Sequence, residues 1–183
     1  MALGRKLMFY INKKSNYPLY RKIRAKYFFK NQNITLGKNV RIFGLPFKIN
    51  VGKNVRFLDN MIIEFGSNGD LQIGDNCLFS YGVLISNNDK IYIGNNVQVG
   101  EYTSIRDTTH RYDRLDVPIR IAGDVSNPIF ISDDVWIGRG CIILPGTKVE
   151  EGVVIGANSV VKGVLFKNGI YAGSPAKLIK SRG

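Results

Sequence analysis

The chain has 183 residues, of which 44% are hydrophobic and 22% charged, a balance that argues against disorder and suits one domain with a sizeable core. No apolar run approaches the length of a membrane span, and we expect neither a membrane helix nor a signal peptide. The two cysteines, Cys77 and Cys141, both fall within repeated segments, so we expect packed free thiols and a reducing cytoplasm rather than a disulfide.

The net charge of +12 is concentrated at one end of the chain. Residues 1–58 hold 14 of the 26 Lys and Arg residues and no Asp or Glu. Such a segment could meet an anionic membrane, a phosphorylated glycolipid or an acidic carrier protein. Nucleic acid is the least favoured partner, because no nucleic-acid-binding motif accompanies the charge. A solvated capping segment explains the same composition equally well.

An amphipathic helix is expected between residues 15 and 30, where Tyr20, Ile23 and Tyr27 are spaced to share one face. Such a helix would cover the open end of the repeats that follow, and membrane attachment is a second, compatible interpretation. We therefore describe residues 1–35 as a basic N-terminal capping segment.

Residues 36–165 contain a branched aliphatic or aromatic side chain at intervals of six. The longest unbroken run consists of Ile131, Ile137, Ile143, Val149, Ile155 and Val161. A helix would repeat its buried face every 3.6 residues and a strand every second residue, so a period of six indicates short strands joined by regular corners. Three such segments make one turn of a parallel β-helix, and five triplets predict about five coils in an all-β fold.

One long insertion, at residues 106–128, interrupts the repeats and carries the only histidine of the chain, His110. Its neighbours Asp107, Arg111 and Asp113 give it a polar setting. Because imidazole titrates near neutral pH, such a histidine can take a proton from a hydroxyl, and we expect an active-site loop here. A single histidine argues against a three-histidine zinc site, so we predict no metal.

The last segment, residues 166–183, is expected to be an extended exit followed by a short helix. Ser174 would be the N-cap of this helix and Pro175 its first residue. Its expected role is a short cap on the last coil.

Four stretches carry a resemblance to a known family: residues 107–119, 133–146, 154–161 and 172–180. They are similar to the left-handed β-helix acyltransferases, specifically the maltose, galactoside and nodulation-factor O-acetyltransferases and their polysaccharide-modifying relatives. The resemblance implies a left-handed coil, acetyl-CoA as cosubstrate, a saccharide acceptor, and a homotrimer with each active site between two subunits.

The resemblance also implies roles for individual residues. His110 would be the general base that deprotonates a sugar hydroxyl, which attacks the thioester of acetyl-CoA directly. The residues that would contact acetyl-CoA are Trp136, Gly138, Ala157, Asn158, Lys162 and Lys177. The residues that would contact the acceptor are Ser80, Asp107, Arg111 and Asp113.

Two of these positions depart from the pattern of the family, and a third has two possible roles. Ser80 stands where sugar acetyltransferases of the maltose group place an asparagine, and Lys162 with Gly163 replaces a Thr-Lys pair. Asp113 is expected either to orient His110 or to pair with Arg114.

The sequence thus favours an acetyl-CoA-dependent O-acetyltransferase that modifies a sugar during surface polysaccharide biosynthesis, in the cytoplasm or at the inner face of the membrane. The alternatives on the same fold are N-acetylation of an amino sugar and acyl transfer from a carrier protein. A non-catalytic β-helix scaffold is the third hypothesis, and it predicts that replacing His110 leaves function intact.

Overall fold

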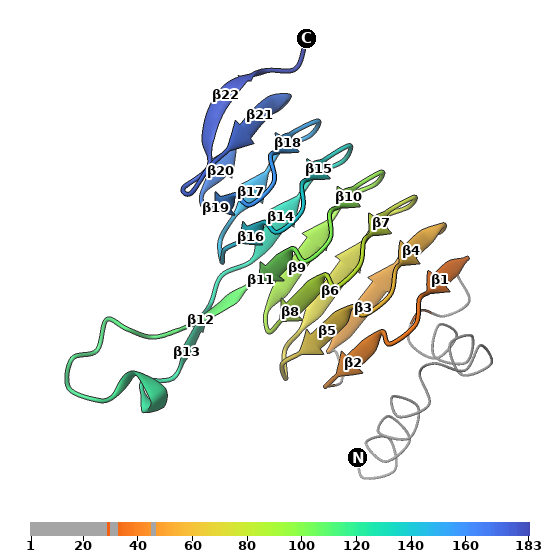
Figure 1. Ribbon diagram of the computed structural model, residues 1–183. Coiled ribbons are helices and arrows are strands. Elements are labelled where there is room, and N and C mark those ends of the chain that lie inside the picture. Colours follow the sequence, from red (N-terminus) through yellow and green to blue (C-terminus); the bar gives the residue numbers. More distant parts are fainter. Residues whose placement is uncertain (1–28, 30–32, 45–46) are drawn as a thin grey trace.

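The computed structural model describes residues 29, 33–44 and 47–183, and the helix expected at residues 15–30 lies, except for Phe29, outside them. The described chain forms a parallel β-solenoid in which each turn gives one short strand to each of three sheets (Figure 1). This arrangement confirms the all-β parallel β-helix predicted from the period of six.

The three sheets are called first, second and third, in the order in which the chain meets them. The first contains β1 (Ile34–Leu36), β4 (Val55–Phe57), β7 (Leu78–Phe79), β10 (Gln98–Val99), β15 (Trp136–Ile137), β18 (Val154–Ile155), β21 (Gly169–Ala172) and β22 (Lys177–Ser181). The second contains β2 (Arg41–Phe43), β5 (Ile62–Phe65), β8 (Leu84–Asn87), β11 (Ser104–Arg106), β16 (Ile142–Ile143) and β19 (Val160–Val161). The third contains β3 (Lys48–Val51), β6 (Asp70–Ile73), β9 (Lys90–Ile93), β14 (Ile129–Ile131), β17 (Lys148–Val149) and β20 (Val164–Leu165).

The repeated aliphatic side chains stack in columns inside the solenoid. In the second sheet the register aligns Ile85, Ile105, Ile143 and Val161 in successive turns, and all four are fully buried. Burying such a side chain stabilises the fold by about 1.5–3 kcal/mol. The period of six therefore arises because each edge of the triangle points one such residue inward.

The N-terminal end of the core is aromatic. Phe57 stacks on Phe79 with ring centroids 5.2 Å apart, and Phe29 stacks on Phe57 at 5.4 Å. Phe29 is itself buried, so the one described residue of the helix expected at residues 15–30 packs against the core of the solenoid.

The solenoid has six complete turns, β1–β3 to β18–β20, followed by β21, where the sequence predicted about five. The additional turn lies at the N-terminal end, where Ile42 is followed nine residues later by Val51. The spacing also breaks at the other end, because Leu165 follows Val161 after four residues. These positions lie within the predicted bounds of 36–165, but corners of unequal length keep them out of the five triplets spaced by six.

The corners of the solenoid are occupied by residues that tolerate a left-handed backbone. Asn54, Asn76 and Asn96 have φ values of 57°, 59° and 57°. Their amides form a ladder in which Asn54 Nδ2 donates to Asn76 Oδ1 at 3.1 Å and Asn76 Nδ2 donates to Asn96 Oδ1 at 3.3 Å. Asn accepts this conformation more readily than most residues, and the ladder satisfies its side chain.

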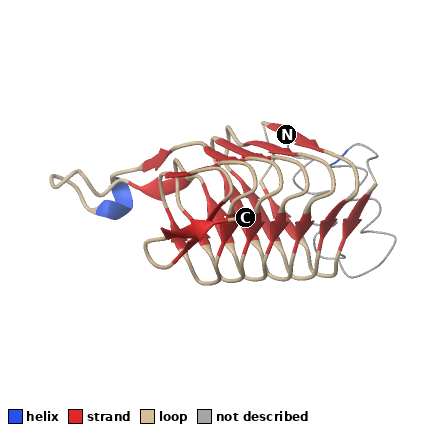
Figure 2. Cartoon of the chain, turned by 90° about the horizontal axis from the view of Figure 1, so that it is seen from above, coloured by secondary structure: helices blue, strands red, loops and turns tan. Residues whose placement is uncertain are grey.

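An antiparallel hairpin leaves the solenoid between β11 and β14. It consists of β12 (Thr108–His110) and β13 (Asp124–Ser126), with a short 3-10 helix η1 (Ile119–Ile121) between them. Figure 2 shows this segment projecting from one side of the stacked coils. The sequence indicated an excursion here but not that its two ends pair with each other.

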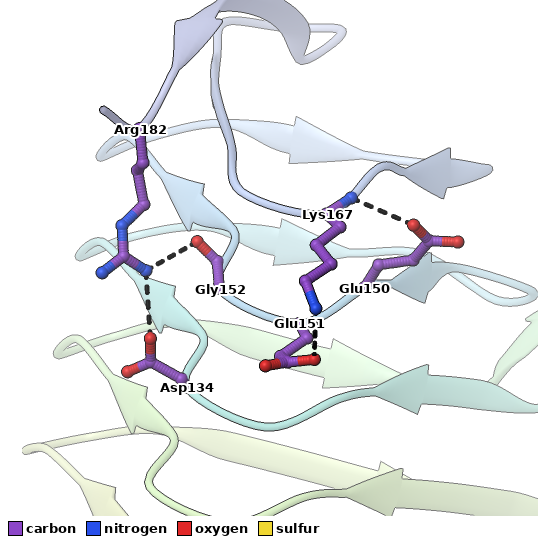
Figure 3. Close-up of polar contacts among 6 residues, drawn as sticks. All are labelled: Asp134, Glu150, Glu151, Gly152, Lys167 and Arg182. Carbon is purple, nitrogen blue, oxygen red and sulfur yellow. Dashed lines mark hydrogen bonds and ion pairs between the residues drawn. The ribbon is translucent and has the colours of Figure 1, made fainter.

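The short C-terminal helix predicted at Ser174 is wrong. Residues Lys177–Ser181 form β22, which pairs antiparallel with β21. The physical reason is that β21 ends the parallel ladder, so its free edge offers backbone groups that need partners. Arg182 fastens the end of the strand: its Nη1 donates to Gly152 O at 2.7 Å and lies 3.2 Å from Asp134 Oδ2 (Figure 3).

No helix within the described part of the chain is long and apolar enough to cross a membrane.

Candidate active site

A cavity of about 520 Å³ lies where the hairpin leaves the second sheet. One wall comes from the hairpin and includes residues 108–113 and Val125. The other wall comes from the solenoid and includes Arg106, residues 142–145 and Lys162. The cavity therefore combines a polar rim from the insertion with an apolar surface from the stacked strands.

His110 lies at this cavity and is held by a carboxylate on the opposite strand of the hairpin. The register pairs His110 with Asp124, and the Nδ1 atom of His110 is 2.6 Å from Asp124 Oδ1. When Nδ1–H donates to a carboxylate, the neutral ring keeps its lone pair on Nε2. The pair thus leaves Nε2 as the atom that can accept a proton from a bound hydroxyl.

The sequence offered Asp113 as the orienting group for His110 or as the partner of Arg114, and the structure gives neither arrangement. Asp113 Oδ2 is 3.8 Å from Arg111 Nη1, while Arg114 pairs with Asp116. The orienting residue, Asp124, was missed because it lies 14 residues from His110 in the chain. Only the register of the hairpin brings the two together, and no sequence motif indicates that register.

Asp107 anchors the root of the hairpin and does not line the cavity. It is fully buried, and its carboxylate accepts hydrogen bonds from Asn87 Nδ2 at 2.9 Å, Asn88 N at 2.8 Å and Asp89 N at 2.9 Å. Thr108 Oγ1 donates to the same carboxylate at 2.9 Å. A buried charge requires such donors, and here they tie the hairpin to the solenoid three residues before His110.

A second set of contacts joins the other strand of the hairpin to this root. Asn88 Nδ2 donates to Ser126 Oγ at 2.9 Å, and Thr108 Oγ1 is 2.9 Å from the same atom. Both β12 and β13 are therefore held where they leave the solenoid, and this positions His110 and Asp124 relative to the second sheet.

The structure brings four of the predicted site residues together at the cavity: His110, Arg111, Asp113 and Lys162. The residues that do not line it are Ser80, Asp107, Trp136, Gly138, Ala157, Asn158 and Lys177. Trp136 stands exposed on the first sheet, and Lys177 lies on β22. Ser80, Gly138, Ala157 and Asn158 follow strands of the first sheet, at the corners that lead to the second.

Gly138 has a packing role that needs no ligand. It is buried, and a Cβ at this position would lie 2.7 Å from the backbone nitrogen of Ala157 in the next turn. Real Cβ atoms do not approach a backbone nitrogen so closely, so the spacing of the coils requires glycine here.

Neither cysteine offers a nucleophile at this site. Both are buried outside the cavity, and burial raises the pKa of the Cys77 thiol to about 11. Burial also raises the pKa of Cys141. Because the thiolate is the reactive form and neither thiol lines the cavity, the structure favours no acyl-cysteine step here.

Comparisons with known proteins agree with this architecture. The family described as "Bacterial transferase hexapeptide (six repeats)" matches residues 128–163. The chain is 31% identical over 156 residues to the "Putative lipopolysaccharide biosynthesis O-acetyl transferase WbbJ" of Escherichia coli, covering 78% of this chain and 80% of that protein. It is 32% identical over 151 residues to the "Probable acetyltransferase Rv3034c" of Mycobacterium tuberculosis, covering 81% of this chain. The chain spans 50% of the length of that second relative.

Two solved structures share the fold. A galactoside acetyltransferase in complex with coenzyme A has a TM-score of 0.61 and 27% identity, covering 98% of this chain and 79% of that chain. A mutant of AntD, an N-acyltransferase from Bacillus cereus, has a TM-score of 0.74 and 22% identity, covering 88% of this chain and 89% of that chain, which shows the fold alone. The repeats, the solenoid and the match to the Escherichia coli protein over most of both chains agree, and the chain belongs to the hexapeptide-repeat acetyltransferase family.

Proposed function

We propose that the protein transfers an acetyl group from acetyl-CoA to a hydroxyl of a saccharide. The observation that carries this proposal is the pairing of His110 with Asp124 at the rim of a cavity. Membership of the acetyltransferase family supports acetyl-CoA as the donor, and a galactoside acetyltransferase of the same fold was solved with coenzyme A.

In the proposed reaction His110 Nε2 accepts the proton of the acceptor hydroxyl as its oxygen attacks the thioester carbonyl. The tetrahedral intermediate then collapses, the carbon–sulfur bond breaks, and the sulfur of CoA leaves with the proton returned by the imidazolium. Asp124 holds the ring and stabilises its transient positive charge. General base catalysis of this kind contributes about 10²–10⁴ in rate.

The acetyl-CoA contacts remain a proposal. Of the six residues that the resemblance implies, Lys162 lines the cavity, and the other five lie elsewhere on the chain: Trp136, Gly138, Ala157, Asn158 and Lys177. We propose a homotrimer in which acetyl-CoA lies between two chains. The exposed indole of Trp136, at 56%, supports a contact with a further molecule. Sedimentation at micromolar concentration tests this assembly, and a purely monomeric protein would contradict it.

We also propose a role in surface polysaccharide biosynthesis, close to the membrane. The name of the Escherichia coli relative refers to lipopolysaccharide biosynthesis, and residues 1–58 carry 14 Lys and Arg without an acid. The free thiols of Cys77 and Cys141 fit a reducing cytoplasm. Co-sedimentation with anionic vesicles tests the membrane contact, and equal binding after removal of residues 1–30 would contradict it.

The decisive experiment is release of CoA thiol from acetyl-CoA in the presence of sugar acceptors. Wild-type protein should release CoA only with an acceptor. His110→Ala should release CoA more slowly by a factor of about 10²–10⁴, with its thermal unfolding unchanged. Two sugars that differ only by an amine in place of one hydroxyl distinguish O-transfer from N-transfer. An acylated carrier protein, supplied in place of acetyl-CoA, tests the alternative donor. Equal rates for wild type and His110→Ala would exclude His110 as the base. The absence of acceptor-dependent CoA release by the wild-type protein would leave the non-catalytic scaffold as the better interpretation.

A further inference from the structure

Three cationic side chains line the cavity from two sides. Arg106 ends β11 of the second sheet, Lys162 directly follows β19 of the same sheet, and Arg111 directly follows His110 at the end of β12. Of the described residues that line the cavity, only Asp113 is acidic. The lining therefore has an excess of positive charge, which a neutral sugar does not need.

The hydrogen-bond donors of these cations are available to a ligand. Arg106 Nη2 is 3.9 Å from Glu64 Oε2, and Arg111 Nη1 is 3.8 Å from Asp113 Oδ2. Both distances exceed the range of a hydrogen bond, so neither guanidinium has its donors committed to these acids. Lys162 forms no ion pair with any residue in the described part of the chain.

The register of the sheet sets the spacing of the cations. Ile105, Ile143 and Val161 are aligned in three successive turns. Arg106 and Lys162, each one residue further along, are therefore separated by two strand spacings, about 10 Å. Leu144 follows β16, the strand between β11 and β19, and lines the cavity together with Arg111 of the hairpin.

This arrangement suits a ligand that carries a carboxylate or phosphate on a sugar ring. A guanidinium binds such groups through two parallel hydrogen bonds, and a cavity lined by one sign of charge attracts the opposite sign. The apolar side chains of Ile142, Leu144 and Pro145 leave a surface on which the ring can lie.

We infer that the acceptor is an anionic sugar, bearing a carboxylate or a phosphate, whose charge is bound by Arg106, Arg111 and Lys162. This inference rests on the proposed function, since it names the substrate class of the same site. The phosphates of CoA are the other anions that could use these cations, and the test separates the two sources.

The test compares glucose, glucuronate and glucose 6-phosphate as acceptors, with CoA release as the readout. The expected KM for at least one anionic sugar is tenfold or more below that for glucose. Arg111→Gln should raise the KM for the anionic sugar by a factor about fivefold to tenfold larger than the factor by which it changes the KM for glucose. Comparison of glucuronate with glucose 6-phosphate then decides between carboxylate and phosphate.

Lys162→Gln and Lys148→Gln form a matched pair for the same assay. Both remove one lysine charge, but Lys148 lies on the third sheet, outside the cavity. Only Lys162→Gln should weaken the preference for the anionic sugar. The inference is overturned if the KM for glucose is as low as the KM for either anionic sugar. It is also overturned if the cavity variants raise the KM for acetyl-CoA and not that for the acceptor, because the cations would then bind CoA.

A binding measurement keeps this inference separate from the proposed reaction. Saturation-transfer NMR without acetyl-CoA reports whether each sugar binds the wild-type protein and Arg111→Gln. If no sugar is acetylated but the anionic sugars bind in an Arg111-dependent manner, the inference stands and the proposed transfer fails. If neither anionic sugar binds better than glucose, the inference fails whatever the enzymatic result.

Discussion

Replacing Asp124 with Asn tests whether this carboxylate orients and supports the proposed base. In the structure Asp124 Oδ1 is 2.6 Å from His110 Nδ1, and the two side chains are 53% and 73% exposed. Hydrogen bonds to charged groups contribute about 1.5–3 kcal/mol, and solvent reduces this for exposed pairs. We therefore expect a loss of about 1–2 kcal/mol in the transition state, where the imidazole becomes positive. That loss corresponds to a fall in kcat of about 5-fold to 30-fold.

The assay is CoA release at saturating acceptor, with KM for acetyl-CoA measured alongside. Asp116→Asn is the matched control, because Asp116 lies in the same excursion and pairs with Arg114 rather than with His110. Thermal unfolding of both variants should match the wild type, since both carboxylates are exposed. An equal kcat for Asp124→Asn and Asp116→Asn would refute the assignment of Asp124 to the base.

Three further predictions concern the scaffold that positions this pair. Asp107→Ala removes the acceptor of four hydrogen-bond donors at the root of the hairpin and should lower the free energy of unfolding by about 3–5 kcal/mol in urea titrations. The exposed Asp113→Ala should change it by less than about 0.5 kcal/mol. Gly138→Ala forces a Cβ against the backbone of the next turn and should lower the same quantity by about 1–3 kcal/mol. The raised pKa of Cys77, about 11, means that the thiolate forms at lower pH in the unfolded chain than in the folded one. Stability should therefore fall as the pH rises from 9 to 11, and less so in Cys77→Ala.

Each of these predictions can fail in a defined way. A wild-type unfolding midpoint for Asp107→Ala would mean that water replaces the carboxylate at the root of the hairpin. An unchanged midpoint for Gly138→Ala would mean that adjacent turns separate at little cost. Rapid reaction of Cys77 with a disulfide reagent in the native protein at pH 8 would show that its thiol is not held in the core.

The fold could be predicted from the sequence because its main physical determinant is periodic. A side chain such as Ile143 must point inward at each edge of the triangle, and the column it joins repeats every turn. That same dependence on regular spacing explains why Leu36 and Ile42, although within the predicted bounds of 36–165, were not counted as a turn. A corner that is longer by three residues changes the interval but leaves the column intact.

The site was predictable only in part. His110 could be found because a single histidine in a long polar insertion is conspicuous in the chain. Asp124 could not, because its proximity depends on the pairing of β12 with β13, which is a property of the folded hairpin. The C-terminal helix failed for a related reason: the Ser-Pro signal is local, whereas the free edge of β21 that β22 satisfies arises only in the assembled solenoid.

The strand β22 has a consequence for how the protein behaves at high concentration. A parallel solenoid that stopped at β21 would present an open ladder on which another chain could continue, as in the growth of a fibre. β22 occupies that ladder in the opposite direction, and Arg182 ties its end to Gly152 and Asp134. Its own outer edge carries Lys177 and Lys180, whose like charges repel a second copy. β22 thus closes the parallel ladder of the first sheet to another chain.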